Sequence, residues 1–191
     1  MSVASSFYQQ GIHVANVDDF LAGLKAMLTG AQPAISLEEA GEALEAFYKE
    51  LEEETTQRAA EAGAAAKAEG EKFLAQMAKD PEVKATKSGL MYKVIKEGTG
   101  RKPKATDKVY CLYEGTFPDG RIFDSSYKRG EPIEFGLNQV IKGWTEGLQL
   151  MSEGAKYELY LPYHLAYGES GTGGIPPYSA LKFVVELIEV R

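Results

Sequence analysis

The side chains that carry most enzyme chemistry are sparse in this sequence. It has one cysteine, Cys111, and two histidines, His13 and His164, which lie far apart along the chain. Cys111 stands within KVYCLYEG, an alternating apolar stretch where we expect a buried structural thiol. These residues are too few for a structural zinc site, and they form no Ser-His-Asp or Cys-His pattern. We therefore set a metal site aside.

Asp124 and Glu134 form a pair of carboxylates that raises the alternative of acid–base hydrolysis. A glycosidase places two such groups on either side of the sugar bond that it cleaves. No second feature of the sequence supports that chemistry, and we set it aside.

The stretch LAYGESGTGGIPPYSALKF, from Leu165 to Phe183, combines four glycines, a proline pair and two tyrosines. Glycine and proline mark turns whatever a protein does, so a long surface hairpin loop is one interpretation. Long loops in compact domains are often functional, so a binding loop that folds over a pocket is the other. The residue types alone leave both open.

The composition is that of a globular protein, with 44% hydrophobic residues, 26% charged residues and a net charge of −7. Phosphate binding needs clustered Lys and Arg, so the acidic balance disfavours nucleic acid as the main partner. No apolar run approaches the ~20 residues of a membrane span, so we expect no membrane insertion. The start, MSVASSFYQQ, lacks the basic and apolar regions of a signal peptide. We expect a cytoplasmic protein, or a periplasmic one if a native start is missing.

Residues 1–80 are dominated by helical periodicity. Asp18 or Asp19 is a candidate cap for a short helix that Gly30 would end. The sequence SLEE, from Ser36 to Glu39, is a capping box that begins a second helix. The apolar residues of these two helices recur along one side of each: Phe20, Leu21, Leu24, Met27 and Leu28, then Leu37, Ala40, Leu44, Phe47, Tyr48 and Leu51.

The second helix is predicted to run from Ser36 to about Lys79, or roughly 65 Å at ~1.5 Å per residue. Beyond Leu51 it is rich in alanine and charged residues, so we expect its middle section to be a solvated stalk. The alternative is a disordered linker, because Gly63 and Gly70 each weaken a helix by ~1 kcal/mol. The short helix and one apolar stripe bury too little surface to be stable alone, and a homodimer would complete their core.

After Pro81 the apolar period becomes two, which is typical of half-buried strands. The predicted strands are GLMYKVIKEG, the two arms of KVYCLYEGTFPDGRIFDSS around a PDG turn, PIEF, AKYELYLP and SALKFVVELIEV, and the predicted helix is QVIKGWTEGLQLM. Antiparallel strands with one helix form an α+β domain. We therefore divide the chain into a helical dimerisation segment at 1–35, a long linking helix at 36–80 and an α+β domain at 81–191.

Motifs in residues 88–191 resemble those of the FKBP-type peptidyl-prolyl cis-trans isomerases. Their order is YEG, FDSS, VIKGW, AYG, IPP and a closing LKFVVEL. The helical first half is similar by pattern to the dimerisation arm and long helix of the Mip-like (macrophage infectivity potentiator) bacterial branch. The resemblance implies an antiparallel half-barrel sheet wrapped on a short helix, with an apolar pocket between them. It also implies acceleration of Xaa-Pro bond rotation in folding proteins.

The resemblance carries over a set of site residues. It implies walls formed by Tyr113, Phe123, Asp124, Val140, Ile141, Tyr167 and Phe183, a floor at Trp144, and Ile175 in the overhanging loop. Arg129 falls where the family often has an arginine that pairs with Asp124. Ile133 occupies a wall position that is aromatic in some members, and the loop after Tyr167 is shorter than in many bacterial members. Both differences concern substrate preference.

The implied reaction requires no nucleophile, metal or cofactor. Amide resonance opposes the rotation with a barrier of ~18–20 kcal/mol, and a dry pocket that strips water from the carbonyl favours the twisted form. In that scheme Tyr167 and the Ile141 amide donate to substrate carbonyls, and Asp124 orients Tyr113. The catalytic candidates are then Tyr167, Asp124 and Tyr113. Asp124 has a structural alternative, as a turn residue bound to nearby backbone amides.

The implied partners are unfolded or partly folded proline-containing polypeptides, and macrolide inhibitors of the tacrolimus or rapamycin type. Two functions remain open. One is an isomerase whose dimeric arm holds unfolded chains and so adds chaperone action. The other is a non-catalytic module that binds proline-containing segments.

Overall fold

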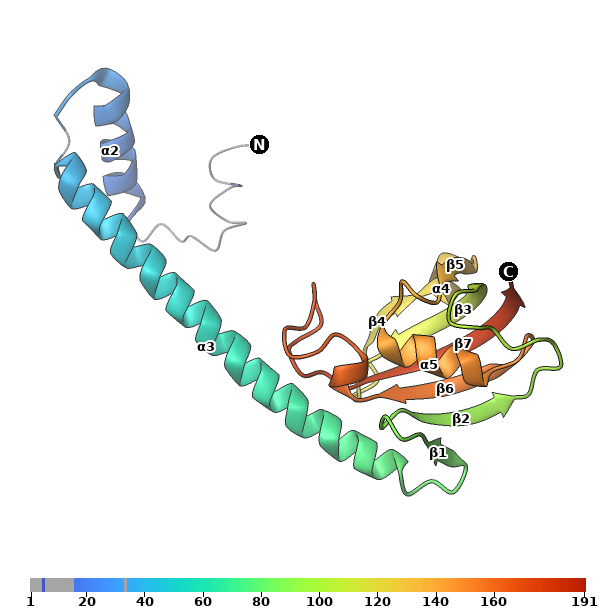
Figure 1. The fold of residues 1–191 in the computed structure, drawn as a ribbon. Coiled ribbons are helices and arrows are strands. Elements are labelled where there is room, and N and C mark those ends of the chain that lie inside the picture. Colours follow the sequence, from blue (N-terminus) through green and yellow to red (C-terminus); the bar gives the residue numbers. More distant parts are fainter. Residues whose placement is uncertain (1–4, 6–15, 33) are drawn as a thin grey trace. The chain divides into compact units, whose positions relative to one another are not determined.

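The computed structural model describes residues 5, 16–32 and 34–191 (Figure 1). The chain divides into two compact units, Met1–Glu54 and Thr55–Arg191. His13 lies outside the described residues. The finer division into three segments stays a prediction.

Helix α2, Val17–Thr29, is the short helix of the first unit. Its N-cap is Asn16, whose side-chain oxygen accepts hydrogen bonds from the amides of Asp18 and Asp19 at 3.0 and 3.2 Å. The predicted cap at Asp18 or Asp19 is therefore wrong, because an asparagine just before them satisfies the first free amides of the helix. Gly30 ends the helix in the left-handed conformation, with φ of 69°, as predicted.

Helix α3, Leu37–Met77, is continuous over 41 residues. Ser36 and Glu39 form the predicted capping box before its first turn. The Ser36 hydroxyl accepts from the Glu39 amide at 3.1 Å, and the Glu39 carboxylate accepts from the Ser36 amide at 2.8 Å. The alternative of a disordered linker is therefore wrong.

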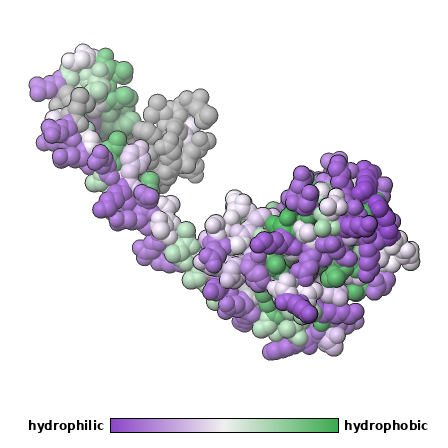
Figure 2. All heavy atoms as spheres, in the orientation of Figure 1, coloured by the Kyte–Doolittle hydropathy of each residue, from purple (hydrophilic) through white to green (hydrophobic). Residues whose placement is uncertain are grey.

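Apolar side chains are exposed on both helices of the first unit (Figure 2). We name this set the arm face; its members are Leu21, Leu24, Met27 and Leu28 on α2, and Leu44, Phe47 and Tyr48 on α3. Leu28 is 78% exposed and Met27 is 62% exposed. Soluble monomers rarely leave large contiguous apolar patches uncovered. An apolar face of this kind is a candidate surface for association.

The second unit contains the last turns of α3, packed against the α+β fold. Gly63 and Gly70 are both buried, and Phe73 packs edge-on against Tyr160 with ring centroids 6.0 Å apart. The expectation of a solvated stalk is therefore wrong from Gly63 onward. Glycine lowers helix propensity, but here its missing side chain lets the helix backbone approach the domain closely.

The rest of the second unit is built on a seven-stranded antiparallel sheet (Figure 1). The strands are β1 Val83–Ala85, β2 Met91–Lys96, β3 Lys108–Thr116, β4 Ile122–Ser125, β5 Ile133–Gly136, β6 Lys156–Leu161 and β7 Leu181–Val190. Their order is β1-β2-β6-β7-β3-β4, and β5 also pairs with β3. The predicted α+β class is confirmed. The prediction missed strand β1 and the one-turn helix α4, Ser126–Arg129, because neither is long enough for its own period to repeat.

Helix α5, Lys142–Leu150, packs on the sheet through its glycines. A Cβ atom built on Gly147 would lie 2.8 Å from Leu159 of β6, so only glycine allows this approach. Trp144 and Leu148 join the core that the inward residues of β3 and β7 form. Cys111 belongs to that core, and burial raises the pKa of its thiol to about 12, as expected of a structural cysteine.

Candidate active site

A cavity of about 270 Å³ is lined by residues from β3, β4, β5, α5 and β7 and from two adjoining loops. Eight of its lining residues were predicted from the sequence: Tyr113, Phe123, Asp124, Val140, Ile141, Trp144, Tyr167 and Phe183. Phe135 and Gln139 also line the cavity and were not predicted. Most of this lining is aromatic or aliphatic, which suits an apolar ring of a ligand.

Trp144 forms the centre of the aromatic wall. Its indole ring is 4% exposed and meets the rings of Tyr113, Phe135 and Phe183 edge-on, with centroids 5.1, 5.3 and 5.4 Å away. These perpendicular contacts match the preferred geometry of aromatic pairs and fix the indole plane. The first helical turn of α5 therefore holds a rigid, dry platform.

One polar cluster borders this apolar surface. The Tyr113 hydroxyl donates a hydrogen bond to the Asp124 carboxylate, and Arg129 donates to Asp124 at 2.5 Å and to the Tyr113 hydroxyl at 3.0 Å. Burial acts to raise the pKa of Asp124, but the hydrogen bonds from Tyr113 and Arg129 outweigh it and hold that pKa below its usual value. Burial, and then the hydrogen bond to Asp124, raise the pKa of Tyr113. Asp124 is thus a carboxylate and Tyr113 a phenol at neutral pH.

Two hydrogen-bond donors adjoin the cavity from opposite loops. Tyr167 is 36% exposed at the start of the Gly-rich loop, and burial followed by the negative charge of Asp124 raises the pKa of its hydroxyl. Ile141 is the N-cap residue of α5, so its amide lies outside the helical hydrogen bonds. Both groups remain neutral donors that could bind a carbonyl oxygen.

Comparison with known proteins places this pocket in a family. Residues 99–188 match the family described as FKBP-type peptidyl-prolyl cis-trans isomerase, and residues 1–94 match the domain amino-terminal to it. The FKBP-type 22 kDa peptidyl-prolyl cis-trans isomerase of Escherichia coli is 41% identical over 191 residues, which are 100% of this chain and 91% of that protein. This chain belongs to the FKBP-type peptidyl-prolyl cis-trans isomerases.

Further matches extend the likeness of this FKBP-type chain to its helical half. The protein named outer membrane protein MIP of Legionella longbeachae is 40% identical, with 99% of this chain and 81% of that protein covered. The crystal structure of FkpA from Escherichia coli has a TM-score of 0.78 at 37% identity, over 98% of this chain and 87% of that one. The FkpA of Aeromonas hydrophila is 48% identical, and this chain spans 60% of its length.

Three predicted site residues of this FKBP-type chain lie outside the first cavity. Ile133 is on β5 opposite Cys111 of β3, and the aromatic residue that lines the cavity is Phe135, on the same face two residues later. Arg129 does not line the cavity, but it donates hydrogen bonds to Asp124 and to the Tyr113 hydroxyl, which do. The third residue, Ile175, lines a neighbouring cavity.

That neighbouring cavity has a volume of about 460 Å³, and it shares Phe123, Asp124 and Tyr167 with the first. Its remaining lining residues are Phe117, Thr172, Gly173, Gly174 and Ile175. Ile175 is 8% exposed and forms a β-bridge with Thr172, which closes the tip of the loop on itself. In this FKBP-type chain the Gly-rich loop thus lines a groove, while its hairpin tip at Thr172–Gly174 stays exposed.

Glu134, the second carboxylate of the pair noted in the sequence, has other partners in this FKBP-type fold. Glu134 is bound by Lys108 at 2.9 Å and by Arg191 at 3.1 Å, so it does not face Asp124 across the cavity. In the part of the chain that the structure describes, no group of three His, Cys, Asp or Glu residues could hold a metal ion. Among the same residues, no helix is long and apolar enough to cross a membrane.

Proposed function

We propose that this FKBP-type isomerase accelerates Xaa-Pro rotation by seating the proline ring on Trp144 and removing water from the preceding carbonyl. The observation that supports this is the aromatic box around Trp144, with three rings perpendicular to the indole. A planar amide is well solvated in water because of its charge separation, so loss of water favours the twisted form. The binding pocket thereby lowers the rotation barrier without a nucleophile.

The polar groups hold the substrate in this scheme. Tyr167 and the Ile141 amide donate to carbonyl oxygens on either side of the proline. Asp124, fixed by Arg129, keeps the Tyr113 ring against Trp144. Asp124 is therefore a positioning residue for the pocket wall, which agrees with the first interpretation made from the sequence, that it orients Tyr113.

A non-catalytic proline-binding module would have the same pocket but would not accelerate isomerisation of the bound Xaa-Pro bond. Proline-limited refolding of a slow-folding protein separates the two functions, because uncatalysed isomerisation takes tens to hundreds of seconds. We expect the full chain to accelerate the slow phase at substoichiometric concentration. Acceleration only at stoichiometric concentration, or none, would support the binding module.

We also propose that the arm face associates with a second copy of the chain and that the dimer holds unfolded polypeptides. The exposed leucines of α2 and the exposed Phe47 and Tyr48 of α3 supply the apolar surface for this. Light scattering of the full chain at tens of micromolar tests the association. A monomer would contradict the dimer, and Leu24→Glu should convert a dimer to a monomer without loss of the second unit's fold.

Macrolide binding and compartment are further proposals. An apolar cavity with two carbonyl-binding donors fits ligands of the tacrolimus or rapamycin type, and inhibition of peptide turnover by either compound tests this. Isomerisation that is insensitive to both would contradict it.

The cytoplasmic location stays a proposal, which fractionation of the producing cells would test.

A further inference from the structure

The last turns of α3 contact the Gly-rich loop through positions that have no side chain. A Cβ atom built on Gly63 would lie 3.0 Å from the Cβ of Pro177, and one built on Gly70 would lie 2.7 Å from the Cβ of Ala180. Both values are at or below the distance that real Cβ contacts tolerate, so the helix lies directly against the loop. These two glycines are the residues that made the sequence resemble a weak linker.

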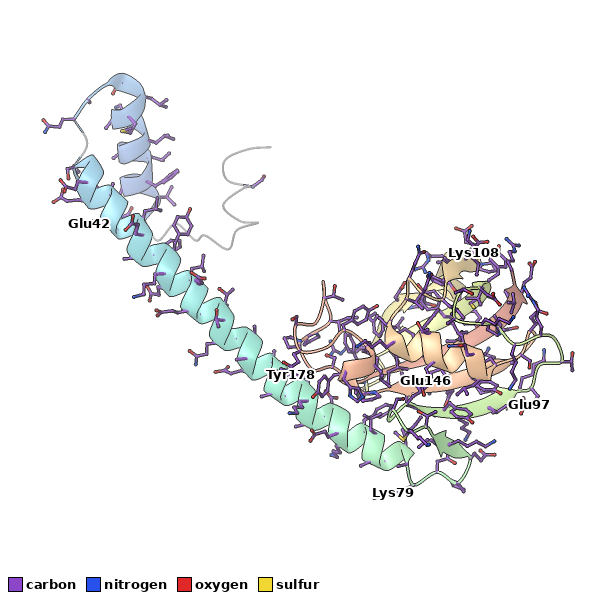
Figure 3. The ribbon with its side chains drawn as sticks, viewed as in Figure 1. Glu42, Lys79, Glu97, Lys108, Glu146 and Tyr178 are labelled. Carbon is purple, nitrogen blue, oxygen red and sulfur yellow. The ribbon has the colours of Figure 1, made fainter. Side chains whose placement is uncertain are left out.

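Tyr178 stands in the sequence between the two contact residues Pro177 and Ala180, and it is labelled beside α3 in Figure 3. The Lys67 ammonium of α3 is 5.5 Å from the centroid of its ring, in cation–π geometry. Tyr178 has a φ of 58°, a left-handed conformation that is uncommon for a residue with a side chain. Its amide donates to Gly168 at 3.0 Å, and its ring packs edge-on against Tyr163. The loop therefore keeps an unfavourable backbone conformation where α3 covers it.

The contacted segment, Ile175–Ala180, leads directly into the substrate site at both ends. Ile175 begins it and lines the groove that contains Tyr167 and Asp124. Ala180 ends it, immediately before β7, which carries the pocket residue Phe183. A displacement of this segment would move one wall of the groove and the start of the strand behind the proline pocket.

We propose that residues 63–73 of α3 are a positioning element of the isomerase, which holds Ile175–Ala180 in the conformation that completes the substrate site. The proposal rests on the isomerase activity proposed above. It gives the linking helix a role in catalysis inside each chain, separate from any role in association. Gly63 and Gly70 are then positioning residues, although neither touches the substrate.

The sharpest test is Gly70→Ala with Gly41→Ala as the matched control. Both glycines lie within α3, and alanine strengthens a helix at either position. The difference is that a Cβ at Gly41 meets nothing within 4 Å, whereas one at Gly70 meets Ala180. For Gly70→Ala we expect kcat/KM on Xaa-Pro peptides to fall about three- to tenfold, mainly through KM. Gly41→Ala should have the same kcat/KM as the unmodified chain.

Two further measurements separate positioning from damage to the fold. Ala180→Gly removes the nearest clashing atom but leaves the backbone nitrogen of residue 180 at 3.2 Å. The double variant should therefore recover part of the activity that Gly70→Ala loses, as a coupled pair does in a double-mutant cycle. Hydrogen exchange of the Ile175 and Tyr178 amides, which bond to Thr172 and Gly168, should become faster in Gly70→Ala. The same amides should stay protected in Gly41→Ala.

Lys67→Ala keeps the test informative if Gly70→Ala does not fold. Lys67 is exposed, so its removal should leave the melting temperature nearly unchanged while it speeds exchange at Tyr178. Lys49→Ala, exposed on the same helix but outside residues 63–73, is its control. Unchanged kinetics and exchange in Gly70→Ala would overturn the proposal, as would unchanged exchange in Lys67→Ala. An unmodified chain without isomerase activity would instead overturn the proposed function.

Discussion

The Tyr113 hydroxyl donates to the Asp124 carboxylate across the antiparallel pair of β3 and β4. Arg129 binds both partners, and its guanidinium lies 5.7 Å from the Tyr113 ring centroid. The Tyr113 ring in turn meets Trp144 edge-on. A charged pair at the rim thus sets the position of a ring in the dry part of the pocket.

Asp124→Asn should lower kcat/KM moderately and leave the melting temperature nearly unchanged. The asparagine keeps the shape and can still accept from Tyr113, but it loses the charge that Arg129 binds. Asp124 has a 40% exposed side chain, so its ion pair with Arg129 contributes little to stability. Peptide turnover and a melting curve check both parts; strong destabilisation would mean that Asp124 is mainly a structural residue.

The pH dependence of binding follows from the direction of the two pKa shifts. The pKa of Asp124 lies below its usual value of 3.8, so the stability that its ionised form gives the folded site is present above that pH and is lost as pH falls through the lower folded value. The pKa of Tyr113 is raised above 10.0, so the stability that its neutral phenol gives the folded site is present below that pH and is lost as pH rises through the higher folded value. We expect peptide affinity to stay level across the interval between these values. A step near neutral pH in a titration would contradict this assignment.

Trp144→Ala should destabilise the second unit by ~3–5 kcal/mol, because it empties a site surrounded by three aromatic rings. Trp144→Leu retains apolar volume, so we expect a folded protein with weaker proline binding. Chemical denaturation and peptide titration of both variants test this. Full affinity in Trp144→Leu would mean that the indole is not the platform for proline.

Limited proteolysis should cut within residues 52–62, where every side chain is exposed on α3. The stable fragment should retain Gly63 and Gly70, because both are buried against the domain. Mass spectrometry of the fragment identifies its first residue. A fragment that begins near Val83 would show that α3 detaches readily from the loop, against its proposed positioning role.

Periodicity and turn chemistry were sufficient to predict α5 and all strands except β1, whereas most of the pocket residues came from the family resemblance. The alternation of β3 and β7 identifies their inward faces, and Gly120 takes a φ of 88° in the PDG turn between β3 and β4. Phe135 could have been found from the same signal, since PIEF places Ile133 and Phe135 on one face. The family resemblance drew attention to Ile133 instead.

The docking of α3 could not be predicted from its residue types. A search for large apolar side chains finds none between Leu51 and Phe73, and glycine counts against a helix in any propensity scale. Gly63 and Gly70 are seven residues apart and so lie on one helix face, but a search based on large apolar residues does not register a face of small ones. The prediction of a solvated segment is wrong there, because a helix without large apolar side chains can still pack against the domain through its backbone.

Tyr167→Phe tests the central claim, that the pocket works mainly by removing water from the substrate carbonyl. Tyr110→Phe is the control, because Tyr110 loses the same hydroxyl from a ring that packs under Arg191. Turnover of short Xaa-Pro peptides is measured by exchange NMR, with a melting curve for each variant. Loss of one hydrogen bond worth ~0.5–1.5 kcal/mol predicts at most about a tenfold decrease in rate for Tyr167→Phe and none for Tyr110→Phe. A decrease of about a thousandfold in Tyr167→Phe with the fold intact, equivalent to ~4 kcal/mol, would show that directed hydrogen bonding dominates and would contradict the account.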